Sequence, residues 1–165
     1  TDAGAAGALT TEITHTGARS VTNLYFAAEQ APVSDPVLVL NGTGQGLINN
    51  IVVMSNVSKA YSPDDRSLVS VTVLEDEGPE TEAKVRAELA EWYPALDLGS
   101  WSHLRTYHIP YALPEQAPPF LSPRDKAVRL ASGLFVCGDH RETASLNGAM
   151  RSGRRAAEAV LAARV

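Results

Sequence analysis

The residues best suited to chemistry lie together near the end of the sequence, between Gly138 and Met150. Gly138 and Asp139 follow the apolar run 134–137, which predicts a short buried strand. A glycine at the end of a strand allows a ligand to approach the backbone, and an aspartate carboxylate accepts hydrogen bonds from ligand hydroxyl groups. This segment is therefore a candidate binding site, at the point where a strand is followed by a helix.

A helix is predicted directly after this loop, over residues 147–163. The first turn of a helix has backbone N–H groups without an intrahelical acceptor, and these favour partial negative charge on a ligand. We expect such free N–H groups around Gly148, Ala149 and Met150. The same helix carries a stripe of small residues, and Gly153 within it costs about 1 kcal/mol relative to alanine. Close packing against this stripe is expected to offset that cost.

Other reactive side chains give a weaker pattern. Cys137 stands close to Asp139 and His140, which suggests a nucleophile or a metal ligand, but its place in an apolar run favours a buried, inert thiol. The remaining histidines are dispersed along the chain, at His15, His103 and His108. We therefore predict no metal site. A cysteine hydrolase is the alternative, and it predicts rapid alkylation of Cys137.

The elements that would position these residues are mostly strands. Short runs rich in valine, leucine, isoleucine and aromatic residues, bounded by turn residues, occur at 21–28, 37–40, 51–55 and 68–74. This spacing predicts an antiparallel meander, and the continuous apolar runs predict strands that are covered on both faces. A helix is predicted over 80–93, followed by a strand over 103–109 and a proline-rich connection over 110–123.

Composition excludes several classes of protein. The chain has 165 residues, a net charge of −5 and a pI near 5.3, which argues against a protein that binds nucleic acid through bulk positive charge. A single cysteine excludes an internal disulfide framework. No apolar run reaches the roughly 18 residues of a membrane span. Because the first residues do not resemble a signal peptide either, a soluble and cytoplasmic protein is expected.

Residues 133–160 resemble the C-terminal flavin-binding signature of FAD-dependent oxidoreductases of the flavin-containing amine oxidase and phytoene desaturase-like superfamily. In that signature an apolar strand ends in Gly-Asp, and after a variable loop a helix opens with a small-residue motif. Gly138-Asp139 and Asn147-Gly-Ala-Met-Arg-Ser-Gly153 match this pattern. Two further segments, 67–73 and 107–114, look like a substrate-domain strand and the pre-signature segment of the same family.

The resemblance implies an FAD cofactor bound by Gly138, by Asp139 and by the first turn of the helix, which contains Asn147, Gly148, Ala149 and Met150. It places Asp139 near the ribityl and pyrophosphate part of FAD, and the first turn near the pyrimidine edge of the isoalloxazine ring. Reduced flavin carries negative charge around N1 and C2=O, which a helix N-terminus stabilises. The implied reaction is hydride transfer to FAD from a small or isoprenoid-like organic substrate.

The other half of such a flavin site is missing from the sequence. The family begins with a βαβ unit carrying Gly-x-Gly-x-x-Gly, whereas the one glycine cluster of a similar kind here is 42–46. Its third glycine comes one position early, and an apolar strand follows instead of a helix, so a glycine-rich hairpin is predicted. We therefore expect the C-terminal part of a larger flavoenzyme, inactive alone, whose partners are an N-terminal FAD-binding half and a small organic substrate.

The expected fold is α+β, with a largely antiparallel or mixed sheet and packed helices, ending in the last strand and helix of a Rossmann-like FAD-binding domain. Its expected parts are a loose lead-in over 1–18, a substrate-domain-like sheet region over 19–130 and the terminal strand and helix over 131–165. The alternative is a non-catalytic binding or assembly module. Such a module would pair with a separate N-terminal chain or form a homodimer through bare sheet edges.

Overall fold

The computed structural model describes residues 2–13, 17–74, 78–120, 122, 126–131 and 133–163. The chain divides into two compact units, one formed by residues 20–110 and the other by residues 1–19 together with 111–165. The proline-rich stretch therefore groups with the terminal helix, and the expected boundary at residue 130 falls inside the second unit.

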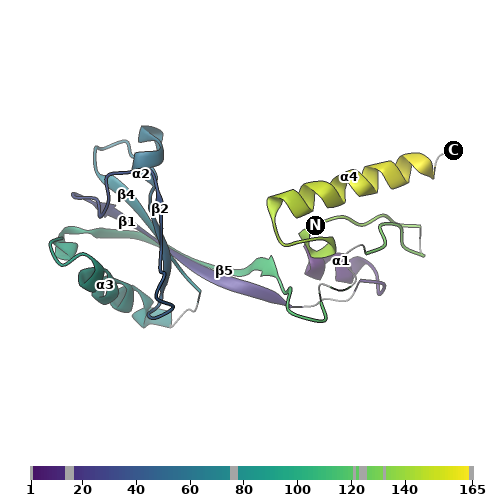
Figure 1. The fold of residues 1–165 in the computed structure, drawn as a ribbon, viewed down its shortest axis with the longest axis horizontal. Helices are drawn as coiled ribbons and strands as arrows, with labels where there is room; N and C mark the ends of the chain where they lie inside the picture. Colours follow the sequence, from purple (N-terminus) through teal and green to yellow (C-terminus); the bar gives the residue numbers. More distant parts are fainter. Residues whose placement is uncertain are drawn as a thin grey trace. The chain divides into compact units, whose positions relative to one another are not determined.

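The unit of residues 20–110 is built on a five-stranded sheet with the strand order β2-β3-β4-β1-β5 (Figure 1). The strands are β1 (Ala18–Ala28), β2 (Leu38–Leu40), β3 (Ile48–Val53), β4 (Ser67–Val73) and β5 (Ser102–Pro114). The pairs β1–β4, β2–β3 and β3–β4 are all antiparallel. The predicted α+β class with an antiparallel sheet is confirmed.

The predicted meander is correct for β2, β3 and β4 but wrong for β1. Strand β1 pairs with β4 over residues Thr22 to Ala28, and this pairing brings Leu24 opposite Val71. β2 has only 3 residues, so it is too short a partner for a strand of 11 residues. Pairing with β4 also places the apolar side chains of two long strands on the same face of the sheet.

Four α-helices occur in the described part of the chain: α1 (Ala3–Leu9), α2 (Met54–Val57), α3 (Thr81–Trp92) and α4 (Leu146–Ala162). Short 3-10 turns lie at Lys59–Tyr61, Gly78–Glu80, Leu98–Ser100 and Asp139–Arg141. Helices α3 and α4 begin and end within one residue of their predicted bounds. Helix α1 lies in the predicted loose lead-in, where the Asp2 side chain caps it by accepting a hydrogen bond from the N–H of Ala5.

Three predicted strands differ in the structure. The strand expected over 103–109 is longer, since β5 continues to Pro114 and takes up the start of the expected proline-rich connection. The strand expected over 51–55 ends at Val53, because the chain turns into α2. The strand expected over 134–137 is reduced to a single bridge between Phe135 and Arg129. A strand forms only where a neighbouring backbone can pair with it. In the described part of the unit formed by residues 1–19 and 111–165, the apolar run 134–137 pairs with the short segment 128–130.

Helix α3 packs on one face of the sheet, and the apolar core lies between them (Figure 1). Leu24, Phe26 and Val71 of the strands and Val85 and Leu89 of α3 are all fully buried in this core. The expectation that both faces of the strands are covered is wrong within this unit. Burial alternates along β1 from Val21 to Phe26, as in a strand with only one buried face.

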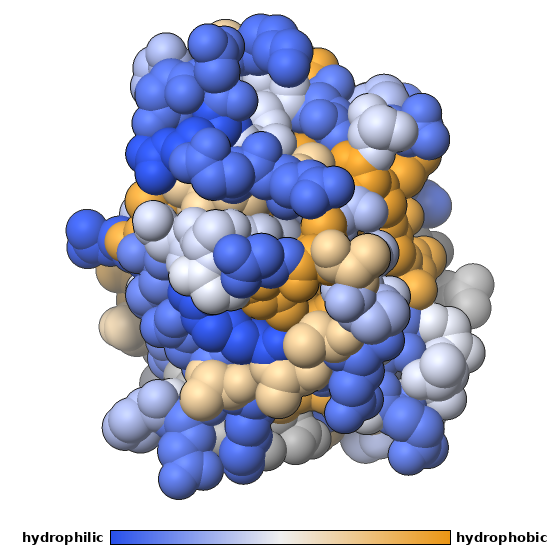
Figure 2. Space-filling model, turned by 90° about the vertical axis from the view of Figure 1, so that its left-hand side faces the viewer, coloured by the Kyte–Doolittle hydropathy of each residue, from blue (hydrophilic) through white to orange (hydrophobic). Residues whose placement is uncertain are grey.

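The opposite face of the sheet, which we call the open face, carries polar and partly exposed side chains. Its cross-strand rows are Leu38–Val52–Ser70–Tyr25 and Leu40–Asn50–Thr72–Asn23. At the edge strand β2, Leu38 and Leu40 are 56% and 65% exposed. Hydrophobic residues also reach the surface on the side shown in Figure 2, where they form a band among hydrophilic ones.

The glycine-rich segment 42–46 connects β2 to β3, and the predicted hairpin is confirmed. Glu88 of α3 fastens this hairpin, since its Oε2 accepts hydrogen bonds from the N–H groups of Leu47 at 2.7 Å and Ile48 at 3.1 Å. Gly46 has a φ of +83°, and a Cβ there would lie 2.3 Å from Oε1 of Glu88. The positive φ at position 46 therefore favours glycine, whereas the carboxylate is the end of a flexible side chain and could move away from a Cβ.

Candidate functional site

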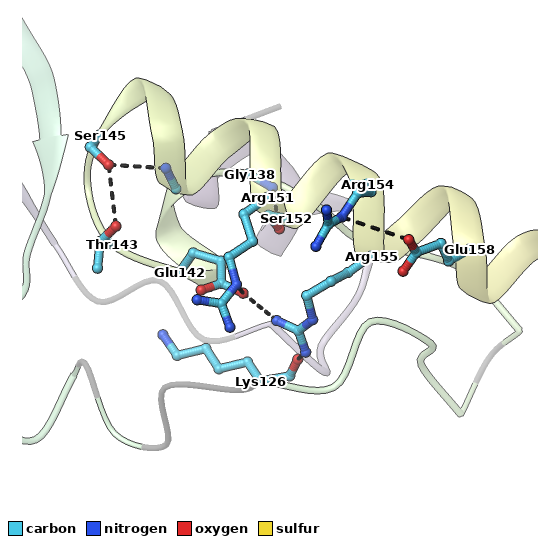
Figure 3. A network of polar contacts seen from close by, with 11 residues as sticks. Lys126, Gly138, Glu142, Thr143, Ser145, Arg151, Ser152, Arg154, Arg155 and Glu158 are labelled. Carbon is cyan, nitrogen blue, oxygen red and sulfur yellow. Dashed lines mark hydrogen bonds and ion pairs between the residues drawn. The ribbon is translucent and has the colours of Figure 1, made fainter.

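The loop before α4 is fastened to that helix at both of its ends (Figure 3). At its beginning, Gly138 has a φ of +151°, in the region that favours glycine, and its N–H donates a hydrogen bond to Oγ of Ser152 at 3.2 Å. Ser152 is 1% exposed. The backbone at Gly138 is therefore held against the second turn of α4.

Asp139 follows Gly138 and keeps part of its carboxylate accessible. Its side chain is 32% exposed, and Oδ1 accepts a hydrogen bond from the N–H of His140 at 2.8 Å. A carboxylate has about four acceptor positions, so this local bond leaves capacity for further donors. Asp139 therefore has acceptor capacity for a donor such as a ligand hydroxyl group.

The first turn of α4 differs in detail from the sequence prediction. Ser145 is the N-cap residue: its Oγ accepts a hydrogen bond from the N–H of Gly148 at 3.0 Å, and its carbonyl accepts one from Ala149 at 2.9 Å. The expectation of free N–H groups around Gly148, Ala149 and Met150 is therefore wrong, since Met150 lies far enough into the helix to donate to the carbonyl of Leu146. The amides that lack an intrahelical acceptor are those of Leu146 and Asn147, because the helix begins one residue earlier than predicted.

Gly148 marks a very close approach between the helix and the preceding loop. It is buried, and a Cβ at this position would lie 1.9 Å from the carbonyl oxygen of Thr143 and 2.8 Å from its Oγ1. By contrast, a Cβ on Gly153 would meet no atom within 4 Å. The close packing that was expected at Gly153 is therefore found at Gly148 instead.

A buried ion pair fastens the middle of the loop to α4 (Figure 3). Oε1 of Glu142 lies 2.5 Å from Nη1 of Arg155 and 3.8 Å from Nε of Arg151. The Glu142 side chain is only 6% exposed. Arg155 also donates from Nη2 to the carbonyl oxygen of Lys126 at 2.9 Å, so its guanidinium joins three separate segments. Glu142, Ser145 and Ser152 are not predicted from the sequence. Of these, only Ser145 carries a signal, as a preferred N-cap type just before a helix.

His140 is buried in this loop in an unusual way. Its side chain is 4% exposed, and neither ring nitrogen has a hydrogen-bond partner among the residues that the structure describes. Burial, followed by the nearby positive charge of Arg141, lowers the pKa of His140 below its ordinary value. The carbonyl oxygen of His140 accepts a hydrogen bond from Nζ of Lys126, whose pKa is also lowered by burial and by Arg141. The imidazole is therefore held in its neutral form in the folded chain.

We expect the free energy of unfolding to fall as the pH drops below about 6.5, the ordinary pKa of histidine. In that range the unfolded chain binds a proton at His140, while the folded chain, with its lowered pKa, binds it only at a lower pH. The variant His140→Leu should keep its stability at neutral pH and lose this part of the acid dependence. Urea unfolding of both proteins at about pH 7.5 and about pH 5.5 measures the difference, and equal pH dependence would contradict the prediction.

Cys137 and the other histidines do not join this site. Cys137 is half-buried and lines an apolar cavity of about 210 Å³. His103 lies 3.2 Å from Glu82, and His108 lies 3.1 Å from Oγ1 of Thr22, whereas His15 falls outside the described residues. No group of three or more metal-binding side chains occurs in the ranges that the structure describes. In those same ranges, no helix is long and apolar enough to cross a membrane.

Comparison with known proteins gives a family and a fold. The family model of flavin containing amine oxidoreductases matches residues 5–161. The crystal structure of an oxidoreductase from Methanosarcina mazei is 16% identical with a TM-score of 0.59, over 96% of this chain and 38% of that one. The PF1083 protein of Pyrococcus furiosus is 17% identical with a TM-score of 0.42, over 55% of this chain and 22% of that one. No curated protein matches the chain. This chain spans well under half the length of both structures.

Proposed function

Since this chain belongs to the flavin-containing amine oxidoreductase family, we propose that it is the C-terminal part of an FAD-dependent oxidoreductase and supplies one side of the FAD site. The observation that carries the proposal is the loop and helix start from Gly138 to Met150, where an accessible carboxylate precedes a helix N-terminus. The family implies a flavin cofactor. That the flavin is FAD, and that these residues bind it, is the proposal.

The residues of this segment fit such a group. The amides of Leu146 and Asn147 have no intrahelical acceptor and favour an electron-rich edge. Asp139 has free acceptor capacity for hydroxyl groups such as those of a ribityl chain. His140 adds two buried ring nitrogens that have no partner in the described part of the chain, which is typical of a polar site that a bound group completes.

Flavin, when bound, supplies the capacity to accept a hydride from an organic substrate. The chain itself contributes binding and electrostatics. The positive end of the α4 dipole lies at Leu146 and Asn147, where it stabilises negative charge. Asp139 accepts hydrogen bonds, and Gly138 leaves room for close approach. The ion pair of Glu142 and Arg155 keeps this loop in one position relative to the helix.

The proposed partner is an N-terminal half that carries the Gly-x-Gly-x-x-Gly unit of a Rossmann-like domain. Two observations support it. The chain covers only 38% of the Methanosarcina mazei oxidoreductase. Helix α4 also exposes three apolar side chains, Leu146 at 85%, Met150 at 73% and Leu161 at 66%, which an additional domain would cover. The alternative remains a non-catalytic assembly module, which would pair with such a partner without binding flavin.

Flavin titration tests the proposal. We expect the 165-residue chain alone to bind FAD weakly or not at all, because most of the cofactor would contact the missing half. Flavin fluorescence and the visible absorbance spectrum during titration measure this. Tight, stoichiometric binding with a bound-flavin spectrum would contradict the expected need for a partner.

The role of Asp139 is tested in the protein that contains both halves. We expect Asp139→Ala to raise the dissociation constant of FAD about tenfold, since each hydrogen bond to a charged group contributes about 1.5 kcal/mol. The matched control is Asp64→Ala, an exposed aspartate that pairs with Arg66 in the other unit. Equal flavin affinity in the Asp139 and Asp64 variants would reject the assigned residues, and no flavin binding by the unaltered protein would favour the assembly module.

A further inference from the structure

The open face of the sheet carries a cavity of about 520 Å³, a volume in the range of small-molecule sites. Its walls are side chains of β1, β4 and β5, among them Asn23, Ser70, Thr72, Tyr25 and Tyr107. Val21 and Ile109 add apolar surface. None of the described side chains that line it carries a carboxylate, an ammonium or a guanidinium group. His108 also lines the cavity, and its Nδ1 lies 3.1 Å from Oγ1 of Thr22. A cationic ligand would therefore lose water here without gaining a counter-charge.

A polar cluster lies in the middle of this mostly apolar wall. Oδ1 of Asn23 accepts hydrogen bonds from Oγ of Ser70 at 3.2 Å and from Oγ1 of Thr72 at 2.8 Å. Nδ2 of Asn23 donates to Oγ of Ser70 at 2.9 Å. Ser70 is buried, and Asn23 and Thr72 are half-buried. These bonds hold the amide of Asn23 in one orientation.

The cluster has one hydrogen-bond donor and one acceptor position that its own hydrogen bonds do not use. An asparagine amide nitrogen has two hydrogens, and Ser70 takes only one of them. A threonine hydroxyl that donates its hydrogen still has lone pairs to accept with, so Thr72 can accept one more bond. A ligand hydroxyl matches both groups at once, since it can accept from Asn23 and donate to Thr72. An ammonium group can only donate, so it would leave the free N–H of Asn23 unpaired.

The aromatic residues beside the cluster also disfavour a cation. Tyr25 and Tyr107 meet edge to face, with ring centroids 5.9 Å apart and planes at 88°. A tyrosine pair of this kind can attract an ammonium group through its ring faces. Here the guanidinium of Arg105 already lies over the ring of Tyr107, 5.3 Å from its centroid. A positive charge therefore already lies beside this pair and would repel a protonated amine.

We propose that this cavity binds the substrate of the oxidoreductase, and that this substrate is an uncharged, largely apolar alcohol rather than an amine. Only the identification of this ligand as the substrate rests on the proposed function. The binding chemistry itself depends only on residues of the open face. It therefore can be measured without flavin and judged separately.

The test uses three eight-carbon probes that differ in their polar group: 1-octanol, octylammonium and octanoate. Each is added to the isotope-labelled 165-residue chain at neutral pH, and the side-chain amide signals of Asn23 are followed by NMR. We expect 1-octanol to shift these signals and to bind at least about tenfold more tightly than either charged probe. The affinity difference would come from the two hydrogen bonds that the hydroxyl makes, or from the cost of burying an uncompensated charge. Equal or tighter binding of a charged probe, or no shift with 1-octanol, would overturn the proposal.

Variants separate the polar cluster from general apolar binding. Thr72→Val removes the accepting hydroxyl at nearly constant shape and keeps the Asn23 reporter, so 1-octanol should bind about fivefold more weakly. Thr106→Val makes the same change at an exposed position of β5 and should leave binding unaltered. Equal affinity in the two variants would exclude the cluster as the recognition element. A positive result with 1-octanol and a failed flavin titration would reject only the proposed cofactor site.

Discussion

Replacing Gly148 by alanine is expected to lower the free energy of unfolding by about 3 kcal/mol. The added methyl group would lie 1.9 Å from the carbonyl oxygen of Thr143, which is a backbone atom and cannot rotate away as a side chain would. Either the loop or the first turn of α4 must move. Because Ser145 caps the helix from the same loop, the hydrogen bond to the N–H of position 148 should be weakened as well. Urea unfolding followed by circular dichroism measures the change.

Gly153 provides a matched control on the same helix. A Cβ there meets no atom within 4 Å, so Gly153→Ala should stabilise the chain by about 1 kcal/mol through helix propensity alone. The same substitution thus has opposite expected signs at two positions five residues apart. If both variants were stabilised, the contact between Thr143 and Gly148 would not exist in solution.

These two glycines show that the position of α4 can be predicted from the sequence, whereas the contacts of its glycines cannot. Helix α4 is predicted within one residue because its signals are local: an N-terminal loop, a periodic pattern and a terminal run of alanine. Which glycine is essential is not a local property, since it depends on how the loop returns against the helix. Sequence spacing assigned the close contact to Gly153, and the structure places it at Gly148.

The sheet illustrates the same division. The apolar runs predict β1 and β4 closely, because strand residues are selected by their own chemistry. The pairing of β1 with β4 rather than β2 depends on strand lengths and on which faces can share a core. Neither property can be predicted from the residues of one segment alone. The sequence does not reveal the alternation between a buried and an open face, since apolar or aromatic side chains occur on both faces of β1: Val21 and Tyr25 on the open face, Leu24 and Phe26 on the buried one. The polar cluster around Asn23 could therefore not be recognised, because its members come from strands 47 or more residues apart in sequence.

Removal of the guanidinium in Arg155→Met is expected to lower the free energy of unfolding by about 3 kcal/mol. The Glu142 carboxylate, 6% exposed, would be left buried without its closest counter-charge, and the carbonyl of Lys126 would lose a donor. The loop that carries Asp139 should then become mobile relative to α4. In the protein with both halves, FAD affinity should fall together with stability, whereas a purely structural pair would change stability alone.

Two further variants make this prediction specific. Arg154→Met removes an exposed arginine from the next position of the helix, where its pair with Glu158 is 74% and 66% exposed, and should cost less than about 1 kcal/mol. The double variant Glu142→Leu, Arg155→Met removes both buried charges and should recover most of the stability that Arg155→Met loses, because the main cost is the unpaired carboxylate. If the double variant were as unstable as the single one, the loss would come from the Lys126 contact and from packing instead. The ion pair would then not be what holds the loop with Asp139 against the helix.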